Sequence, residues 1–335
     1  MDSRWTLQQV HDLALQALLS SGGGVQQSTV VAQSIAEAEA QGIRNVGLAY
    51  LPTYCAHLRC GKVNGHALAR TEVTAPSILQ VDACSGFAHT AFMAALPEFV
   101  AMVHNQGIAM MTIRNSYSAG VLGWFIHRFL DHGLLSLAFS NASAMMAPVG
   151  GSKPVFGTNP WGFGVPQEGS DPIVADMSST ATARVNVIAA AQAGGPIPAG
   201  WAIDVDGRPT TNPQAALAGT MAPAAGHKGY ALALLVDVLI AGVGGANWSF
   251  EASSLLDNSG GPPGVGQCFI AIDPTRCAPG FAQRVTRLAQ AIQEQEGARL
   301  PGSGRAGHAA HANVHGVEVP HSLAAELRAL AHPGQ

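Results

Sequence analysis

The first 65 positions carry apolar residues at helical spacing. Thr6 followed by Gln9 is a capping-box pattern that predicts the start of one helix, and the small residues of 20–24 predict its end. A second helix is predicted over 28–42, starting at its N-cap serine. A third is predicted over 47–60, closed by the glycine that follows. The N-terminal part of the chain is therefore predicted to be a helical unit.

From position 78 the chain changes to short apolar runs that alternate with helix-length segments. This pattern is typical of buried strands and the helices between them. The predicted strands are 78–81, 108–113, 134–139 and 268–272, and the predicted helices are 89–105, 121–131 and 229–241, the last of them buried. The sequence therefore predicts a mixed α/β protein.

Two helices are predicted beyond these segments. Four apolar residues mark one face of an amphipathic helix, and they are Phe281, Val285, Leu288 and Ile292. A short helix is predicted to start at Ser322. The segment 148–213 is rich in Gly, Pro, Asn and Ser, which predicts loops close to a functional site. The polar, histidine-containing segment 306–315 is expected to be mobile.

Composition excludes two classes of protein. The 335 residues are 47% hydrophobic and only 11% charged, which excludes a disordered chain. Lys and Arg number 17 against 21 Asp and Glu, so the net charge of −4 leaves no basic excess for a nucleic acid. At about 150 residues per domain, the length predicts roughly two domains.

Cysteine usage and the N-terminus predict a cytoplasmic protein. The five cysteines form no CxxC pair, which argues against a disulfide framework and a structural zinc site. The N-terminus lacks the charged-then-apolar order of a signal peptide. The apolar stretch 229–246 has Asp237 near its middle, and a central Asp costs about 2.5–3.5 kcal/mol in a membrane. We therefore expect no membrane span.

Two segments carry candidate chemistry. No P-loop is present, and no predicted strand is followed by GxGxxG. Glycines in GGSKPVFGTNP (150–160) let the backbone approach a ligand, and Thr158 and Asn159 add side-chain donors. In GHKG (226–229), His227 and Lys228 precede the helix at 229–241, and a cation pair at a helix N-terminus binds anions. The alternative for 150–160 is a glycine-rich turn between strands. The alternative for His227 and Lys228 is a pair of solvated surface cations.

Together these segments resemble the type-2 malate/L-lactate dehydrogenase family. Its members include sulfolactate and ureidoglycolate dehydrogenases and reductases of Δ1-piperideine-2-carboxylate and Δ1-pyrroline-2-carboxylate. The resemblance covers nearly the whole chain in the same order. The matching text is VDACSGFAH (81–89), RNSYSAGVLG (114–123), GGSKPVFGTNPWGFGVP (150–166), AGHKGYALALLVDVL (225–239) and RLPGSGR (299–305).

The resemblance implies an α/β fold with a non-Rossmann dinucleotide-binding domain built on a largely antiparallel sheet. It implies helical and substrate domains beside it, and a homodimer. The implied helical domain is 1–65 with about 279–300, and the substrate domain is 66–125 with about 301–335. The dinucleotide-binding domain is then 126–278. The missing GxGxxG is expected for such a fold.

The resemblance also implies which residues contact a nicotinamide cofactor. They are Ser118, Ala119, Gly120, Val121, Leu122, Thr158, Asn159, Asp176, Met177, Ser178, His227, Lys228 and Arg305. A cation pair suits a pyrophosphate or a 2′-phosphate, which favours NADPH, with NADH as the alternative.

The chain departs from its relatives at the catalytic positions. Relatives carry Ser-His-Gly followed three residues later by Arg. Here Asn45 replaces the Ser, Val46 the catalytic His and Tyr50 the Arg. Asn186 stands where a carboxylate partner of that His is expected, and the NSxH segment reads Asn-Ser-Tyr117-Ser, without its His.

These losses fit one another physically. A ketone reductase uses a His to give a proton to the oxygen, with a carboxylate that stabilises the imidazolium. Without the His, a buried carboxylate would be an unpaired charge costing several kcal/mol, and Asn186 avoids that cost. A cyclic imine needs no such acid, because it can enter already protonated at nitrogen. The sequence therefore favours reduction of Δ1-pyrroline-2-carboxylate to proline or of Δ1-piperideine-2-carboxylate to pipecolate.

Two alternatives stay open. The chain could be a 2-hydroxy acid dehydrogenase of sulfolactate, malate or lactate type, with a substitute acid among Tyr50, Tyr54, Tyr117 and His89. It could also be a non-catalytic member that binds the dinucleotide. His89 could instead cap or pack a helix, the tyrosines could face the core, and Asn45 could orient the substrate or cap a helix.

Three histidines near the C-terminus do not predict a metal site. His308, His311 and His315 are three and four residues apart, but we interpret them as mobile histidines and expect no metal.

Overall fold

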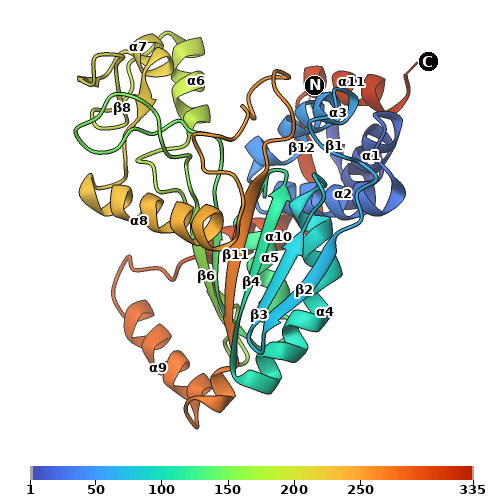
Figure 1. The fold of residues 1–335 in the computed structure, drawn as a ribbon, viewed down its shortest axis with the longest axis vertical. Coiled ribbons are helices and arrows are strands. Elements are labelled where there is room, and N and C mark those ends of the chain that lie inside the picture. The colour runs from blue at the N-terminus through green and yellow to red at the C-terminus, as the bar shows by residue number, and fades with distance from the viewer. Residues whose placement is uncertain (1–2, 334–335) are drawn as a thin grey trace.

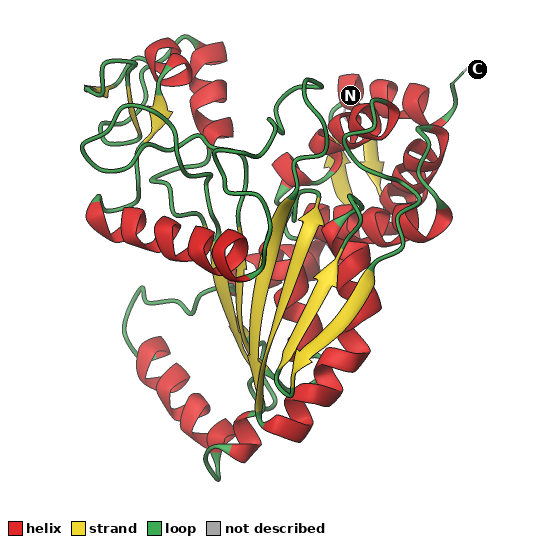
Figure 2. Ribbon diagram, viewed as in Figure 1, coloured by secondary structure: helices red, strands yellow, loops and turns green. Residues whose placement is uncertain are grey.

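The computed structural model describes residues 3–333, and its centre is a seven-stranded sheet (Figures 1 and 2). The strand order is β2-β3-β4-β11-β5-β6-β7. The strands are β2 (Arg70–Ala75), β3 (Ile78–Asp82), β4 (Ile108–Ser116), β5 (Leu135–Ser140), β6 (Trp161–Val165), β7 (Ile173–Met177) and β11 (Val265–Ile272). β3 and β4 are parallel, and the other neighbouring strands are antiparallel. The largely antiparallel sheet and its four predicted strands are thus confirmed.

Helices cover both faces of this sheet. On one face, α4 (Ala88–Gln106) and α5 (Leu122–Leu130) pack through an aromatic core. There the Phe92 ring lies 5.0 Å from Phe125 and 5.1 Å from Phe269 of β11. On the other face, Val236 and Ile240 pack against strand side chains. They belong to α8 (His227–Asp237) and to the π-helix Val238–Val243 that continues it.

A second core lies in the helical layer formed by the two ends of the chain, drawn in blue and red in Figure 1. Its elements are α1 (Leu7–Ser20), α2 (Val25–Ala40), α3 (Leu51–Arg59), α10 (Ser303–His315), α11 (His321–Ala331), β1 (Ser3–Trp5) and β12 (Val317–Val319). The predicted capping box is confirmed, because Gln9 N donates to Thr6 Oγ1 at 3.2 Å and Thr6 N donates to Gln9 Oε1 at 2.8 Å. β1 pairs with β12 and joins the chain ends.

Two predicted boundaries in this layer are wrong. α2 is capped by Gly24 rather than Ser28, since Ser28 is buried inside the helix. The helix predicted over 47–60 begins instead as the 3₁₀ turn Leu48–Tyr50 and continues as α3, and a second 3₁₀ turn, Arg44–Val46, precedes it. Proline at position 52 explains this start, because it suits the first turn of a helix.

The expected mobility of 306–315 is also wrong. This segment forms most of α10, which packs on α2 and buries Ala312. Its alanines have the highest intrinsic helix propensity, and the segment contains no proline. The three histidines His308, His311 and His315 therefore lie on a helix.

The segment 148–213 is more ordered than predicted. Besides β6 and β7 it holds α6 (Arg184–Ala193), β8 (Ala202–Ile203) and β9 (Pro209–Thr210). With α7 (Pro213–Ala218) and β10 (Thr220–Met221) these elements form a small unit, at the upper left of Figure 1. Met146, Phe156 and Val187 lie in its core.

The helix predicted to be buried at 229–241 is buried on one side only. Gly229, Ala233 and Val236 face the interior, whereas Leu234 and Leu235 are 42% and 48% exposed. One side of α8 packs on the sheet, and nothing covers the other within residues 3–333. Among those residues, no helix is long and apolar enough to cross a membrane.

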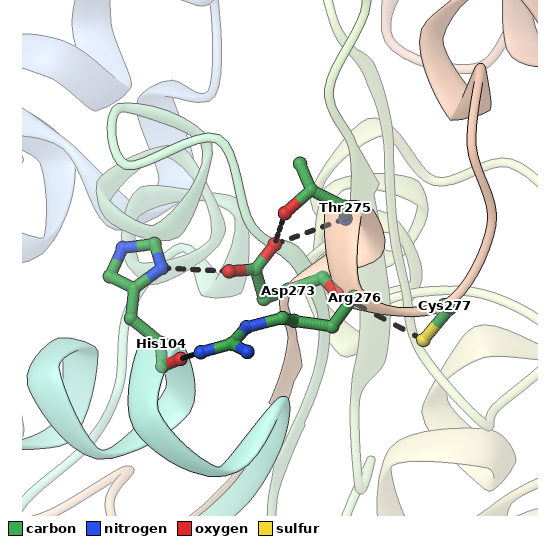
Figure 3. A network of polar contacts seen from close by, with 5 residues as sticks. All are labelled: His104, Asp273, Thr275, Arg276 and Cys277. Carbon is green, nitrogen blue, oxygen red and sulfur yellow. Dashed lines mark hydrogen bonds and ion pairs between the residues drawn. The ribbon is translucent and has the colours of Figure 1, made fainter.

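The predicted amphipathic helix is α9 (Phe281–Gln293), which extends away from the sheet (Figure 1). A polar network lies in the turn that precedes this helix in the chain (Figure 3). His104 of α4 lies 3.0 Å from the Asp273 carboxylate, and Thr275 Oγ1 donates to the same carboxylate at 2.6 Å. Arg276 donates to the His104 carbonyl at 2.8 Å. Hydrogen bonds from Thr275, then His104, lower the pKa of Asp273. The network ties the turn after β11 to the end of α4.

The implied domain boundaries stay a prediction. The sheet takes β2, β3 and β4 from the implied substrate domain and β5, β6, β7 and β11 from the implied dinucleotide-binding domain.

Candidate active site

One group of candidate cofactor residues lies where β4 leads into α5. The loop between them contains Ser118, Ala119, Gly120 and Val121, and Ser118 Oγ accepts from Gly120 N at 3.4 Å. Asp176 at the end of β7 reaches the start of α5, where its Oδ2 accepts from Gly123 N at 3.0 Å. Arg305 donates to the same Oδ2 and to the Asp176 carbonyl, both at 3.3 Å. The fold thus brings Leu122, Asp176 and Arg305 together from distant parts of the chain.

A second group lies where three other segments meet. Ser178 Oγ donates to Thr158 O at 3.1 Å, and Ala224 N donates to Ser179 O at 2.9 Å. Gly229 closes this junction, since a Cβ on it would lie 2.7 Å from Ser179 O. The junction therefore requires glycine at 229 and places Thr158 and Ser178 near the start of α8.

Asn159 in this group is an internal structural residue. It is fully buried, and its Nδ2 donates to Ala233 O at 3.0 Å. Its Oδ1 accepts from Ser249 Oγ at 3.2 Å, and Ser249 also donates to Asp237 at 2.9 Å. Its side-chain donors and acceptor hold α8 to the loop, so a ligand contact at this position would use its backbone.

His227 and Lys228 are exposed in the first turn of α8. Gly226 before them has φ +60° and leaves the helix end without a side-chain cap. Gly229 N already donates to Ala224 O at 2.8 Å and Lys228 N to Ala225 O at 3.5 Å, so the two exposed side chains are what the first turn offers to an anion.

The two residues at the positions of the relatives' Ser and His lie on the 3₁₀ turn Arg44–Val46. Val46 is partly buried against the core that includes Ala119 and Val121, and Asn45 is exposed. Beneath them lies the buried Glu39, whose Oε1 accepts from Leu48 N at 2.7 Å. Burial raises the pKa of Glu39. A Cβ on Gly47 would collide with the Glu39 carboxyl, so this turn needs glycine there.

Three tyrosines form a buried cluster beside α3. The Tyr54 ring lies 4.8 Å from Tyr50 and 5.9 Å from Tyr117. The Tyr50 hydroxyl donates to Leu255 O at 3.1 Å. Burial raises the pKa of all three hydroxyls. They are thus weaker acids than free tyrosine.

The Tyr117 hydroxyl is held by His57, a residue that the sequence did not single out. The His57 Nε2 lies 3.0 Å from the Asp257 carbonyl, which can only accept. Nε2 therefore carries the proton, and Nδ1 accepts from the Tyr117 hydroxyl. Burial lowers the pKa of His57, which favours this neutral form.

Lys62 is a second residue that the sequence did not single out. It is fully buried, and its Nζ donates to the carbonyls of Ser254 and Asp257, the latter at 2.9 Å. Together with Tyr50 and His57, it holds the backbone of the loop 254–257 against α3. No local pattern marks Lys62, because both of its partners lie about 190 positions away in sequence.

His89 lies at the start of α4 beneath the loop that contains Gly120. Its ring lies 5.0 Å from Phe125, stacked, and 4.9 Å from Trp124. Within residues 3–333 neither ring nitrogen has a hydrogen-bond partner. Burial, and then Arg128, lower the pKa of His89 to about 3. The imidazole is therefore neutral near pH 7 and is not a proton donor of matched strength.

Asn186 lies in the first turn of α6 and is exposed, with its Nδ2 donating to Thr182 Oγ1 at 2.8 Å. Arg184, two positions earlier, lines a cavity of about 360 Å³ that the loop 249–256 closes on one side. The sequence did not single out Arg184. Its place on a wall of this cavity follows from the packing of α6 on α7.

Comparisons with known proteins identify the family of this chain. The family model described as malate/L-lactate dehydrogenase matches residues 5–328. The chain belongs to the malate/L-lactate dehydrogenase family. The predicted resemblance is thus confirmed, and the chain is an oxidoreductase.

Three relatives within this family are informative. The chain is 41% identical to a (2R)-3-sulfolactate dehydrogenase (NADP(+)) of Chromohalobacter salexigens, over 97% of both chains. It is 36% identical to a Delta(1)-pyrroline-2-carboxylate reductase of Ancylobacter novellus, over 99% of this chain and 98% of that protein. The crystal structure of delta1-piperideine-2-carboxylate reductase from Pseudomonas syringae matches with a TM-score of 0.93 at 34% identity, over 98% and 99% of the two chains. The family therefore holds both hydroxy-acid and imine chemistry.

Proposed function

We propose that this protein is an NADPH-dependent reductase of a cyclic imine carboxylate, converting Δ1-pyrroline-2-carboxylate to proline or Δ1-piperideine-2-carboxylate to pipecolate. The observation that carries the proposal is Val46, a side chain with no proton to give, at the position of the relatives' catalytic His. The 36% and 34% identical relatives named as imine carboxylate reductases support it.

The candidate substitute acids do not replace that His. The Tyr50 hydroxyl donates to Leu255 O and the Tyr117 hydroxyl to His57, and burial raises the pKa of both. Burial raises the pKa of Tyr54 as well and lowers that of His89 to about 3. A ketone needs an acid for its forming alkoxide, and general acid catalysis is worth about 10²–10⁴-fold. An imine that is already protonated at nitrogen needs none.

The residues present fit a dinucleotide. The exposed side chains of His227 and Lys228 at the start of α8 suit phosphate, which favours NADPH over NADH. The other contacts we propose are those of the loop 118–122, Thr158, Asp176, Met177, Ser178 and Arg305, with Asn159 contributing its backbone. When bound, a reduced nicotinamide supplies the hydride. The side chains of Val46 and Ala119 have no proton to donate, so the imine has to enter already protonated at nitrogen.

The first test is a substrate panel with both cofactors. Absorbance of the reduced nicotinamide should fall with Δ1-pyrroline-2-carboxylate or Δ1-piperideine-2-carboxylate, faster with NADPH than with NADH. Brisk turnover of a 2-oxo acid with no turnover of either imine would refute the proposal. Cofactor binding by fluorescence without turnover of any substrate would establish a non-catalytic member instead.

A second candidate function is a 2-hydroxy acid dehydrogenase. It is favoured by the 41% identity to a (2R)-3-sulfolactate dehydrogenase. This function needs a proton donor, so Tyr117→Phe or His89→Ala should then abolish reduction of the 2-oxo acid. The homodimer and the cytoplasmic location that we expect are part of the proposal under either chemistry.

A further inference from the structure

A cavity of about 360 Å³ lies where the loop 249–256 meets the segment 143–145 and the start of α6. Its wall includes Ser143, Met145, Arg184, Ser249, Ser254 and Leu256. A pocket of this size takes a small organic ligand. Its lining is uncharged apart from Arg184.

Hydrogen bonds link the wall of the cavity to two parts of the candidate active site. On one side Ser254 and Leu256 flank Leu255, whose carbonyl accepts from the Tyr50 hydroxyl. On the other side Met145 N donates to Phe156 O at 2.8 Å, two positions before Thr158. A molecule in the cavity would therefore contact Ser254 and Leu256 of the loop held by α3 and Pro154 of the segment 150–160.

Arg184 faces this cavity without a counter-ion. One of its N–H groups donates to Leu217 O at 3.0 Å, at the end of α7. Within residues 3–333 no carboxylate pairs with it, and burial alone lowers its pKa. A partly desolvated guanidinium with free N–H donors gains most from a carboxylate, which it binds with two parallel hydrogen bonds.

The other cations near the cavity are already in use or absent. Lys62 donates to two backbone carbonyls on the far side of the loop. Position 50 offers no positive charge, because it is a tyrosine whose hydroxyl donates to Leu255 O. Arg184 is the charged group among the residues that line the cavity.

We propose that Arg184 is a specificity-determining residue that binds the carboxylate of the substrate in this cavity. The Ser143 hydroxyl then hydrogen-bonds the other carboxylate oxygen, and Met145 and Leu256 contact the ring. This assignment rests on the proposed function in one respect only, the class of small carboxylate substrate. A lysine at this position would keep the charge but lose the paired N–H geometry.

The test measures binding rather than turnover. Picolinate and picolinamide have the same planar ring, and only picolinate carries the negative charge. Their Kd values are measured by calorimetry in the presence of NADP⁺, for wild type and for Arg184→Gln. Wild type should bind picolinate more tightly than picolinamide. The variant should lose about ten- to a hundredfold in affinity for picolinate and little for picolinamide, as expected for a charged hydrogen bond.

Two further variants separate binding from folding. Arg208→Gln changes an exposed arginine that lies 3.3 Å from Asp206, and it should leave both affinities unchanged. Arg184→Lys should recover part of the lost picolinate affinity, even if Arg184→Gln is unstable. Equal weakening of both ligands in both Arg184 variants, or picolinate binding no tighter than picolinamide in wild type, would overturn the assignment.

The binding result is independent of the proposed reaction. If wild type fails to reduce either imine while Arg184→Gln selectively loses picolinate, the reaction is wrong and the anion site stands. If wild type reduces the imines and Arg184→Gln keeps its picolinate affinity, the reaction stands and the anion site is wrong.

Discussion

Replacing His89 by phenylalanine should make the protein markedly more resistant to mild acid. His89 is 1% exposed and stacks on Phe125 at 5.0 Å. Burial, and then the positive charge of Arg128, lower its pKa from 6.5 to about 3. The unfolded chain takes up a proton at this position near pH 6.5 and the folded chain does not. Stability is therefore lost as the pH falls below 6.5 and levels off only near pH 3.

The size of the effect follows from the same two pKa values. One pH unit of differential protonation is worth about 1.4 kcal/mol. pH 5 lies about 1.5 units below the pKa of the unfolded imidazole and well above the pKa of the folded one. Between pH 7.5 and pH 5, His89 therefore lowers the free energy of unfolding by about 2 kcal/mol. Phenylalanine keeps the aromatic packing and removes this proton uptake.

Urea unfolding at fixed protein concentration measures the difference. Wild type and His89→Phe are compared at pH 7.5 and at pH 5, and the change between the two pH values should be smaller in the variant by about 2 kcal/mol. His132→Phe, at an exposed histidine, should behave as wild type. An equal loss of stability in wild type and His89→Phe would show that the imidazole is protonated in the folded protein, and would refute the reasoning.

Two further predictions concern buried charged groups. Lys62→Met leaves the carbonyls of Ser254 and Asp257 without their donor. The free energy of unfolding should therefore fall by about 2 kcal/mol, and amide hydrogen exchange should speed up in 254–257. Lys153→Met, at an exposed lysine, is the control, and unchanged exchange in Lys62→Met would contradict the role of Lys62. Glu39 has a raised pKa because it is buried, so the stability it contributes when protonated is lost as the pH rises from about 4.5 through that raised pKa. Glu39→Gln should remove this part of the pH dependence in urea unfolding, and an identical profile in wild type and variant would contradict the assignment.

The sequence predicted the elements whose signals are local. The Thr6–Gln9 capping box is confirmed because both hydrogen bonds close within three residues. The start of α2 was wrong because Ser28, a good N-cap residue, lies four residues inside a helix that Gly24 begins. The order of 306–315 was missed because its histidines and glycine drew attention away from the helix-favouring alanines, and its packing on α2 lies far away in the sequence.

The residues of the candidate site also divide into those that the sequence identified and those that only the structure shows. The resemblance supplied the candidate cofactor residues, and the fold places Asp176 and Arg305 together at Gly123, next to Leu122. Asn159 reads as a ligand donor in the sequence, yet its side chain is used up by Ala233 and Ser249. Lys62 and Arg184 have partners far away in the chain, so their importance becomes visible only in three dimensions.

The most direct test of the central claim is to return the missing acid. Under the proposed function, Val46 limits this enzyme to substrates that bring their own positive charge. We predict that Val46→His raises kcat/KM for a 2-oxo acid relative to that for Δ1-pyrroline-2-carboxylate by about 100-fold or more, with Val205→His, at an exposed valine, as the control. Efficient reduction of the 2-oxo acid by wild type, with no gain from Val46→His, would contradict it.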